Sequence, residues 1–251
     1  MSNFLQSSCG LSNDYHAAAL RLSGSGTGGG PCFYGYLTLP DNRASLGRGL
    51  IVLQEIYGLN AEVRRVCDWL ASNGYHALAP DLYWKSGNHV EYDYEDRPNA
   101  LAHARSLDFN VIAEDIKAGF VSLERILGGR EKVGILALGW GGKPGLMARK
   151  SLPGVPMSIY YPGGLAGEDN LINDSVGATQ YHFGLLDERS PQEFCDWIAS
   201  LYQGKDGFEM HVYENSLHGF ANHGRKEYHE DNARIVYERT LEFFDAQFND
   251  Q

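Results

Sequence analysis

The fold is decided by the stretch Lys132-Val133-Gly134-Ile135-Leu136-Ala137-Leu138-Gly139-Trp140-Gly141-Gly142-Lys143. Its first half is almost entirely apolar, and a short apolar run of this kind predicts a strand that is buried on both faces. A glycine-rich turn follows at Gly139–Gly142, and residues 143–150 then predict a helix. The stretch therefore predicts a strand that passes through a tight turn directly into a helix.

Strands and helices alternate on both sides of this stretch. Val63, Val66 and Leu70 share one face of a predicted helix at 61–73, and a similar stripe predicts a helix at 111–127. A terminal helix is predicted at 230–248. Short apolar runs predict further strands at 33–40, 49–54, 75–80, 156–161, 179–185 and 209–213. Such alternation predicts an α/β fold with a mostly parallel sheet that is flanked by helices.

Length and composition predict one large domain. The chain has 251 residues, of which 43% are hydrophobic, and this is enough for a full core. We expect an N-terminal segment, 1–32, with a flexible Gly/Ser-rich loop at 23–31, followed by a single domain over 33–251.

Charge and cysteine content limit the partners. The net charge of −11 argues against nucleic acid, because phosphate binding needs a basic face. The sequence shows no apolar run long enough for a transmembrane helix and no signal peptide, so we expect a cytoplasmic protein without a membrane partner. Its four cysteines form no CxxC pair, which indicates reduced thiols, with Cys67 on the apolar face of a helix. The histidines show no metal-ligand pattern, so we expect no metal and no cofactor.

Polar residues gather where predicted strands end, which is where open parallel sheets bind ligands. Asp187 follows the strand at 179–185, and His218 follows the strand at 209–213. The order of a glycine-rich turn, an Asp and a His is that of an α/β hydrolase triad, in which the Asp orients the His and the His is the general base. Taken singly, Asp187 could be a turn or capping residue and His218 a satisfied loop histidine. Their order along the chain favours the functional interpretation.

The chain resembles the dienelactone hydrolase family, a branch of the α/β hydrolase fold without a cap domain. The resemblance runs from Phe33 to the C-terminus, and it is carried by residues 53–60, residues 74–83, the turn at Gly139, Asp187 and His218-Gly219-Phe220. It implies a triad of Cys, Asp187 and His218, with Glu55 beside the resting nucleophile. It also implies an oxyanion hole made by the backbone N–H groups of Ile56 and Trp140.

The departures from the family pattern change the expected chemistry. The family has Gly-x-Cys-x-Gly-Gly where this chain has Ala137-Leu138-Gly139-Trp140-Gly141-Gly142, so Gly139 stands at the nucleophile position. The two family arginines that grip the dienelactone carboxylate are replaced by Lys85 and Asn222. Dienelactone itself is therefore not the expected substrate.

Three functions remain compatible with a glycine at position 139. In the first, His218 acts as a general base on water or on a substrate C–H or O–H, for hydrolysis or for a lyase, isomerase or cyclase step, and Glu55 serves as a second acid or base. In the second, the protein binds a small molecule without turning it over. In the third, it is a structural or interaction protein in which the pocket is only a remnant. Retention of Glu55, Asp187 and His218 argues against the third function, because a buried Asp–His pair is costly unless it is satisfied. Of the other two, the enzyme is the expected function and the binding protein is the alternative.

The predicted mouth of the site indicates the kind of substrate. Substrate contacts are expected from Tyr57, Trp84, Lys85, Phe220 and Asn222. Such an aromatic-rich set favours a small, apolar or aromatic substrate. We expect the protein to act as a monomer or a homodimer.

Overall fold

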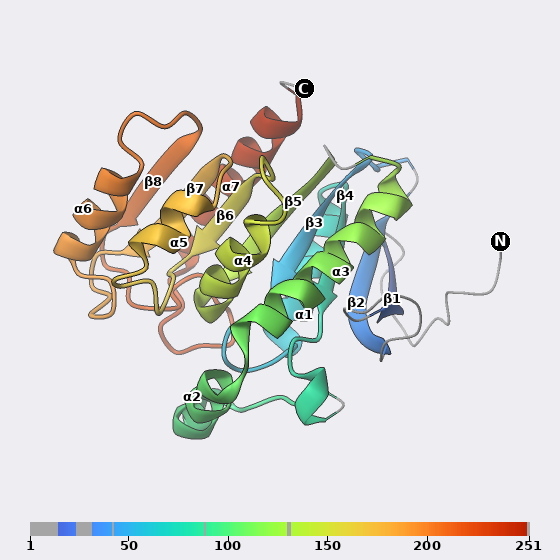
Figure 1. Ribbon diagram of the computed structural model, residues 1–251, viewed down its shortest axis with the longest axis horizontal. Helices are drawn as coiled ribbons and strands as arrows, with labels where there is room; N and C mark the ends of the chain where they lie inside the picture. The colour runs from blue at the N-terminus through green and yellow to red at the C-terminus, as the bar shows by residue number, and fades with distance from the viewer. Residues whose placement is uncertain (1–14, 24–31, 42, 88, 130–131, 250–251) are drawn as a thin grey trace. The chain divides into compact units, whose positions relative to one another are not determined.

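A computed structural model describes residues 15–23, 32–41, 43–87, 89–129 and 132–249 of the chain. Within it the chain forms two compact units, Met1–Gly134 and Ile135–Gln251 (Figure 1). Most of the predicted Gly/Ser-rich loop, residues 24–31, lies outside the described residues.

The sheet of the first unit mixes antiparallel and parallel pairs. Its strands are β1 (Tyr15–Ser23), β2 (Cys32–Pro40), β3 (Arg48–Leu53) and β4 (Tyr75–Pro80). They lie in the order β1-β2-β4-β3, and β3 and β4 are parallel while the other neighbours are antiparallel.

Strand β1 was not predicted, since residues 1–32 were expected to be an N-terminal segment with a loop. Its sequence contains three consecutive alanines, which have low β-propensity. Pairing along the full length of β2, from Tyr15 opposite Pro40 to Ser23 opposite Cys32, overrides that weak local preference.

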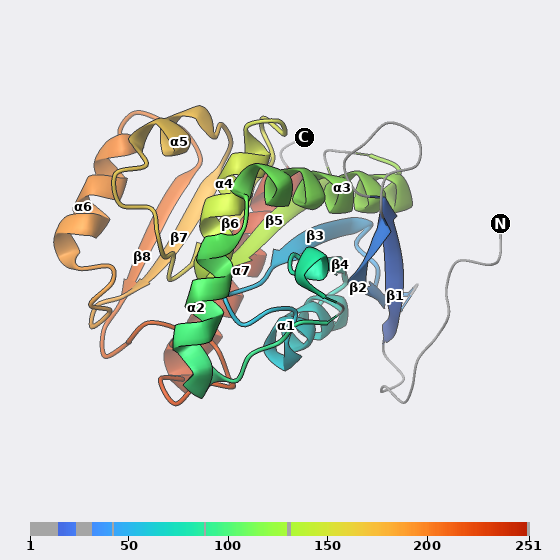
Figure 2. The same ribbon diagram turned by 60° about the horizontal axis from the view of Figure 1, so that its bottom comes forward.

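Two long helices cover opposite faces of the first unit's sheet (Figure 2). They are α1 (Ala61–Ser72) and α3 (Phe109–Leu127). Asn60 caps the start of α1, because its Oδ1 accepts a hydrogen bond from the N–H of Val63 at 3.2 Å. Helix α3 ends at Gly128, whose φ lies in the left-handed region. Between β4 and α3 lie two short 3₁₀ turns, η1 (Trp84–Ser86) and η2 (Tyr94–Asp96), and helix α2 (Arg97–Ser106). Helix α2 was not predicted, because it buries only alanines and so lacks an apolar stripe.

The second unit is an all-parallel sheet with helices on both faces. Its strands β5 (Val133–Leu138), β6 (Met157–Tyr160), β7 (Thr179–Gly184) and β8 (Phe208–Tyr213) are neighbours in chain order. Helices α4 (Gly142–Arg149), α5 (Asp169–Asp174) and α6 (Gln192–Leu201) cover one face, and α7 (Glu230–Asn249) covers the other (Figure 1). Of these helices, α5 and α6 were not predicted.

In the second unit, successive side chains along each strand point to opposite faces of the sheet. On β6, Ser158 and Tyr160 point to the same side. Tyr160 Oη lies 2.8 Å from Thr240 Oγ1 of α7, and Ser158 Oγ donates to Gln180 Oε1 of β7 at 2.8 Å. The layer under α7 is therefore partly polar, and its hydrogen bonds fix α7 to the sheet.

None of the helices in the described part of the chain combines the length and apolarity needed to cross a bilayer.

Candidate functional site

The turn after β5 has the strand–turn–helix form that the sequence predicted. The strand ends at Leu138, Gly139 has a φ of 50° in the left-handed region, and the 3₁₀ turn η4 (Gly139–Gly141) leads into α4. A Cβ atom on Gly142 would lie 2.9 Å from Ile159 Cγ2, so the start of α4 packs closely on β6. Trp140 lies half-buried in the turn, directly after a residue that has no side chain.

Backbone hydrogen bonds join the loops that follow β7 and β8. Leu186 N–H donates to Ser216 O at 2.9 Å, and Leu185 N–H donates to Tyr213 O at 2.9 Å. The backbone approach is so close that a Cβ atom on Gly184 would lie 2.3 Å from Ser216 O. These contacts set the distance between the two loops, which carry Asp187 and His218.

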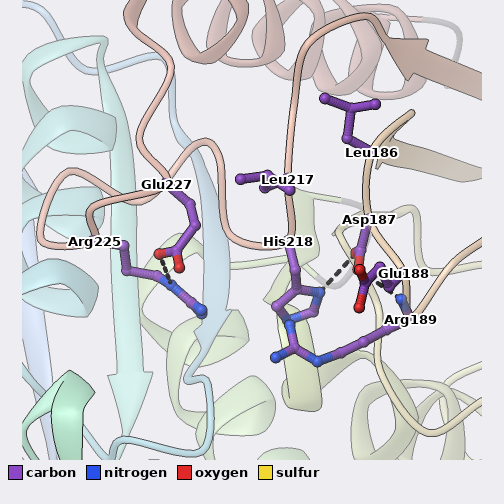
Figure 3. Close-up of a pocket in the computed structure, with 8 residues that line it drawn as sticks. All are labelled: Leu186, Asp187, Glu188, Arg189, Leu217, His218, Arg225 and Glu227. Atoms are coloured by element: carbon purple, nitrogen blue, oxygen red, sulfur yellow. Dashed lines mark hydrogen bonds and ion pairs between the residues drawn. The ribbon is translucent and has the colours of Figure 1, made fainter.

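Asp187 and His218 are joined by a short hydrogen bond (Figure 3). His218 Nδ1 lies 2.7 Å from Asp187 Oδ2, and Asp187 Oδ1 accepts the N–H of Arg189 at 2.9 Å. The Asp187 side chain is 1% exposed and that of His218 is 15% exposed. With the ring proton on Nδ1, Nε2 of His218 is a proton acceptor, and no described residue hydrogen-bonds to it. The arrangement can take a proton from a small molecule at Nε2.

Tyr161 packs against this histidine from the end of β6. Its ring meets the imidazole of His218 edge-on at 5.4 Å and lies 6.0 Å from the ring of Phe220. Its φ of 37° is unusual for a bulky residue, and such strained residues concentrate at functional sites. Tyr161 was not predicted as a site residue, although its place at the end of the predicted strand at 156–161 was a usable signal.

A charged pocket of about 270 Å³ opens beside His218 (Figure 3). Arg225 and Glu227 lie on one side of the histidine, with Arg225 Nε 3.3 Å from Glu227 Oε2, and Asp187 lies on the other. The exposed side chains of Leu186 and Leu217 supply apolar surface. Arg225 was not predicted, because its spacing of seven residues from His218 matches no motif.

Two of the predicted substrate contacts are buried. Phe220 and Asn222 are both 0% exposed, and Asn222 Oδ1 accepts the N–H of Gly224 at 2.9 Å. Phe220 packs on Tyr213 at 5.1 Å between ring centres. Their positions favour support of the loop that carries His218 over direct contact with a substrate.

The remaining predicted residues lie in the first unit. Glu55 and Tyr57 are buried, and Ile56 O accepts a hydrogen bond from Tyr83 Oη at 2.8 Å. Trp84 stacks on Phe33 at 5.3 Å and donates to Asp115 Oδ2 at 2.8 Å, so much of its ring is used in packing, whereas Lys85 is exposed. That these residues share one site with His218 stays a prediction.

Neither cysteine with a described side chain has the properties of a nucleophile. Cys67 is fully buried in α1, as predicted, and burial raises the pKa of its thiol well above the usual value. Burial, aided by the nearby Asp196 and Asp187, raises the pKa of Cys195 to about 11. Both thiols are therefore protonated at neutral pH, whereas the thiolate is the reactive form.

A buried histidine contacts the last residue of β8, after which the loop that carries His218 begins. His182 of β7 has Nδ1 2.8 Å from Tyr213 Oη and Nε2 2.8 Å from Gln180 Oε1. Burial, and then the charges of His211 and Arg239, lower its pKa well below the usual value, so its ring is neutral. This neutral ring links β7 to the end of β8.

Metal ligands are not grouped in the described part of the chain, where no three His, Cys, Asp or Glu side chains are placed to hold one ion.

The sequence is similar to that of dienelactone hydrolases and carboxymethylenebutenolidases. The model of the dienelactone hydrolase family matches residues 33–248. The carboxymethylenebutenolidase of Pseudomonas sp. (strain P51) is 28% identical over 223 residues, which cover 85% of this chain and 90% of the relative. A second relative, carboxymethylenebutenolidase 1 of Cupriavidus pinatubonensis, is 23% identical over 77% of this chain and 83% of its own length.

Solved structures share the fold. A Klebsiella pneumoniae crystal structure that bears the name of a dienelactone hydrolase has a TM-score of 0.81 and 23% identity, covering 92% of this chain and 99% of that one. A dienelactone hydrolase-like promiscuous phosphotriesterase from metagenomic libraries has a TM-score of 0.77 and 16% identity, covering 94% and 99%. The predicted α/β fold with a mostly parallel, helix-flanked sheet is confirmed, and the described residues form no separate cap domain. Because the family model spans most of the sequence, the chain belongs to the dienelactone hydrolase family, a family of hydrolase-like enzymes.

Proposed function

We propose that this protein hydrolyses a small ester or lactone with His218 as general base, and without a covalent nucleophile at the turn after β5. The observation that carries the proposal is the 2.7 Å hydrogen bond between His218 Nδ1 and the buried Asp187. It orients the imidazole, leaves Nε2 to accept a proton from water, and stabilises the imidazolium that results.

The vacant position at Gly139 explains why water is the nucleophile. Glycine has no side-chain atom that could form an acyl-enzyme. Cys67 and Cys195 are buried, with raised pKa values, and do not replace the missing thiolate. The relatives named carboxymethylenebutenolidase support hydrolysis over a lyase, isomerase or cyclase step.

A further group of the second unit has a proposed role: the backbone N–H of Trp140, in the turn after β5, stabilises the oxyanion. The roles predicted for Ile56 and Glu55 concern residues of the first unit and stay predictions. A general base contributes about 10²–10⁴-fold to the rate, and one oxyanion donor contributes about 10²–10³-fold. The substrate is small, and the exposed Leu186 and Leu217 give its apolar part a surface beside His218.

A double-mutant cycle tests the roles of the two side chains. Values of kcat/KM are measured on 4-nitrophenyl esters of short acids and on simple lactones for the wild type, His218→Ala, Asp187→Ala and the double variant. We expect His218→Ala to lose about 10²–10⁴-fold. In the wild-type background, Asp187→Ala should cause much of the same loss of kcat/KM. In the His218→Ala background, it should cause almost no further loss. Glu193→Ala, an exposed carboxylate at the start of α6, is the matched control.

A second measurement tests the absence of a nucleophile. Acid-quenched reactions are analysed by intact mass, and no acyl-enzyme that depends on His218 should accumulate. Undiminished turnover in His218→Ala, additive losses in the cycle, or a His218-dependent acyl-enzyme each contradict the proposal.

A further inference from the structure

A serine outside the site described above is hydrogen-bonded to a histidine. Ser86 is the last residue of η1, and its Oγ lies 2.6 Å from His103 Nε2 on α2. On the other side of the ring, His103 Nδ1 lies 3.0 Å from Tyr92 Oη. All three residues lie in the first unit. Ser86, His103 and Tyr92, which we call the Ser86 cluster, thus have the arrangement of a nucleophile, a base and a group that orients the base.

The imidazole of His103 is held in place by its neighbours. Its ring lies 4.3 Å from the ring of the buried Tyr83 and 5.7 Å from the ring of Tyr92, which it meets edge-on. With two aromatic contacts and a hydrogen bond at each nitrogen, the ring has little freedom to turn. The tautomer with its proton on Nδ1 donates to Tyr92 Oη and leaves Nε2 to accept the proton of Ser86.

The protonation state of His103 suits a base. Desolvation lowers its pKa from the usual value of 6.5, so the ring is neutral at pH 7. Ser86 itself is exposed, and a reagent in solution can therefore reach its hydroxyl.

The Ser86 cluster is attached to a segment that the sequence assigned to the site. Tyr83 Oη donates to Ile56 O at 2.8 Å, and Tyr92 N–H donates to Tyr57 O at 3.1 Å. The neighbours of His103, Tyr83 and Tyr92, thus connect the Ser86 cluster to residues 56 and 57 of the same unit.

We propose that Ser86 is a covalently reactive serine, with His103 as its base and Tyr92 as a positioning residue, that accepts acyl and phosphonyl groups from activated esters and fluorophosphonates. In this step Ser86 Oγ attacks the carbonyl carbon or the phosphorus, and its proton passes to His103 Nε2. The bond to the leaving group breaks, and the leaving alcohol or fluoride departs while His103 releases the proton. Water then hydrolyses an acyl adduct, whereas the phosphonyl adduct persists. The proposal is independent of His218 and of the reaction proposed for it.

Labelling with an alkyl fluorophosphonate tests the proposal. The full-length protein is treated with the reagent, the rate is followed by intact mass, and the modified peptide is mapped. We expect one phosphonyl group on Ser86 and none on that peptide in Ser86→Ala. The rate should fall about 100-fold in His103→Gln, at the lower end of what a general base supplies, and by less in Tyr92→Phe. In the wild type the rate should rise with pH and reach half its maximum below pH 6.5, and this dependence should vanish in His103→Gln.

Two further variants separate the possible outcomes. Ser72→Ala removes an exposed hydroxyl that bonds only to a helix carbonyl, and it should label like the wild type. In His218→Ala, labelling of Ser86 should persist while the ester turnover proposed above is lost, so the two proposals fail separately. The proposal is overturned if no adduct forms on Ser86, or if the adduct forms equally fast in His103→Gln.

Discussion

We expect the hydrogen bond between His218 and Asp187 to depend on Gly184, the last residue of β7. A Cβ atom on Gly184 would lie 2.3 Å from Ser216 O, about 1 Å short of the 3.4 Å at which ordinary van der Waals contact begins. Both partners in this clash are backbone, so no side-chain rotation relieves it. We therefore expect Gly184→Ala to move the loop that carries Asp187 away from the loop that carries His218.

The size of the effect follows from that distance. Overpacking of this kind costs about 1–3 kcal/mol of stability, and a displacement of about 1 Å at a catalytic group can cost about 10²-fold in rate. Thermal unfolding and kcat/KM measure the two losses, and the downfield proton resonance of His218 Nδ1 reports the hydrogen bond directly. Gly163→Ala is the control, since a Cβ there has no neighbour within 4 Å and Gly163 lacks the left-handed φ that penalises side chains. The reasoning is refuted if Gly184→Ala keeps both the resonance and the wild-type rate.

Two other changes probe the turn and the buried histidine. Gly139→Ser places a hydroxyl at the predicted nucleophile position. Because the φ of 50° disfavours a side chain, the substitution should lower the free energy of unfolding by about 1–2 kcal/mol. The Gly139→Ser variant should also gain a fluorophosphonate adduct at residue 139 that His218→Ala suppresses, whereas Gly139→Ala introduces the backbone strain without a hydroxyl. An unlabelled Gly139→Ser would contradict the prediction that residue 139 stands at the nucleophile position. Because the pKa of His182 is lowered in the folded state, the unfolded chain binds its proton first, so the free energy of unfolding should fall as pH drops below 6.5. Urea unfolding from pH 7 to pH 5 should show a shallower fall in His182→Gln, and equal slopes would contradict the assignment.

Local patterns in the sequence predicted the elements with strong periodicity. The apolar run of β5, the helical stripe of α3 and the β4 strand all lie where they were expected, within one or two residues. Strand β1 and helix α2 were missed because their alanine-rich sequences have no strong local signal, and β1 is fixed by its pairing with β2. Periodicity records which residues are buried, but not which distant partner buries them.

For the candidate site too, some features could be predicted from the sequence and others arise only from tertiary contacts. By itself the sequence placed Asp187 and His218 after two strands of a parallel sheet and placed a glycine at the turn after a third, because the order of strand ends along the chain is a local property. Only the tertiary structure decided that the two loops approach within hydrogen-bond distance at Leu186 and Ser216, and that Arg225 lies beside His218. It also decided that Ser86 meets His103, seventeen residues along the chain. These contacts arise from the packing of segments that are distant in sequence, and the spacing of residues along the chain does not record them.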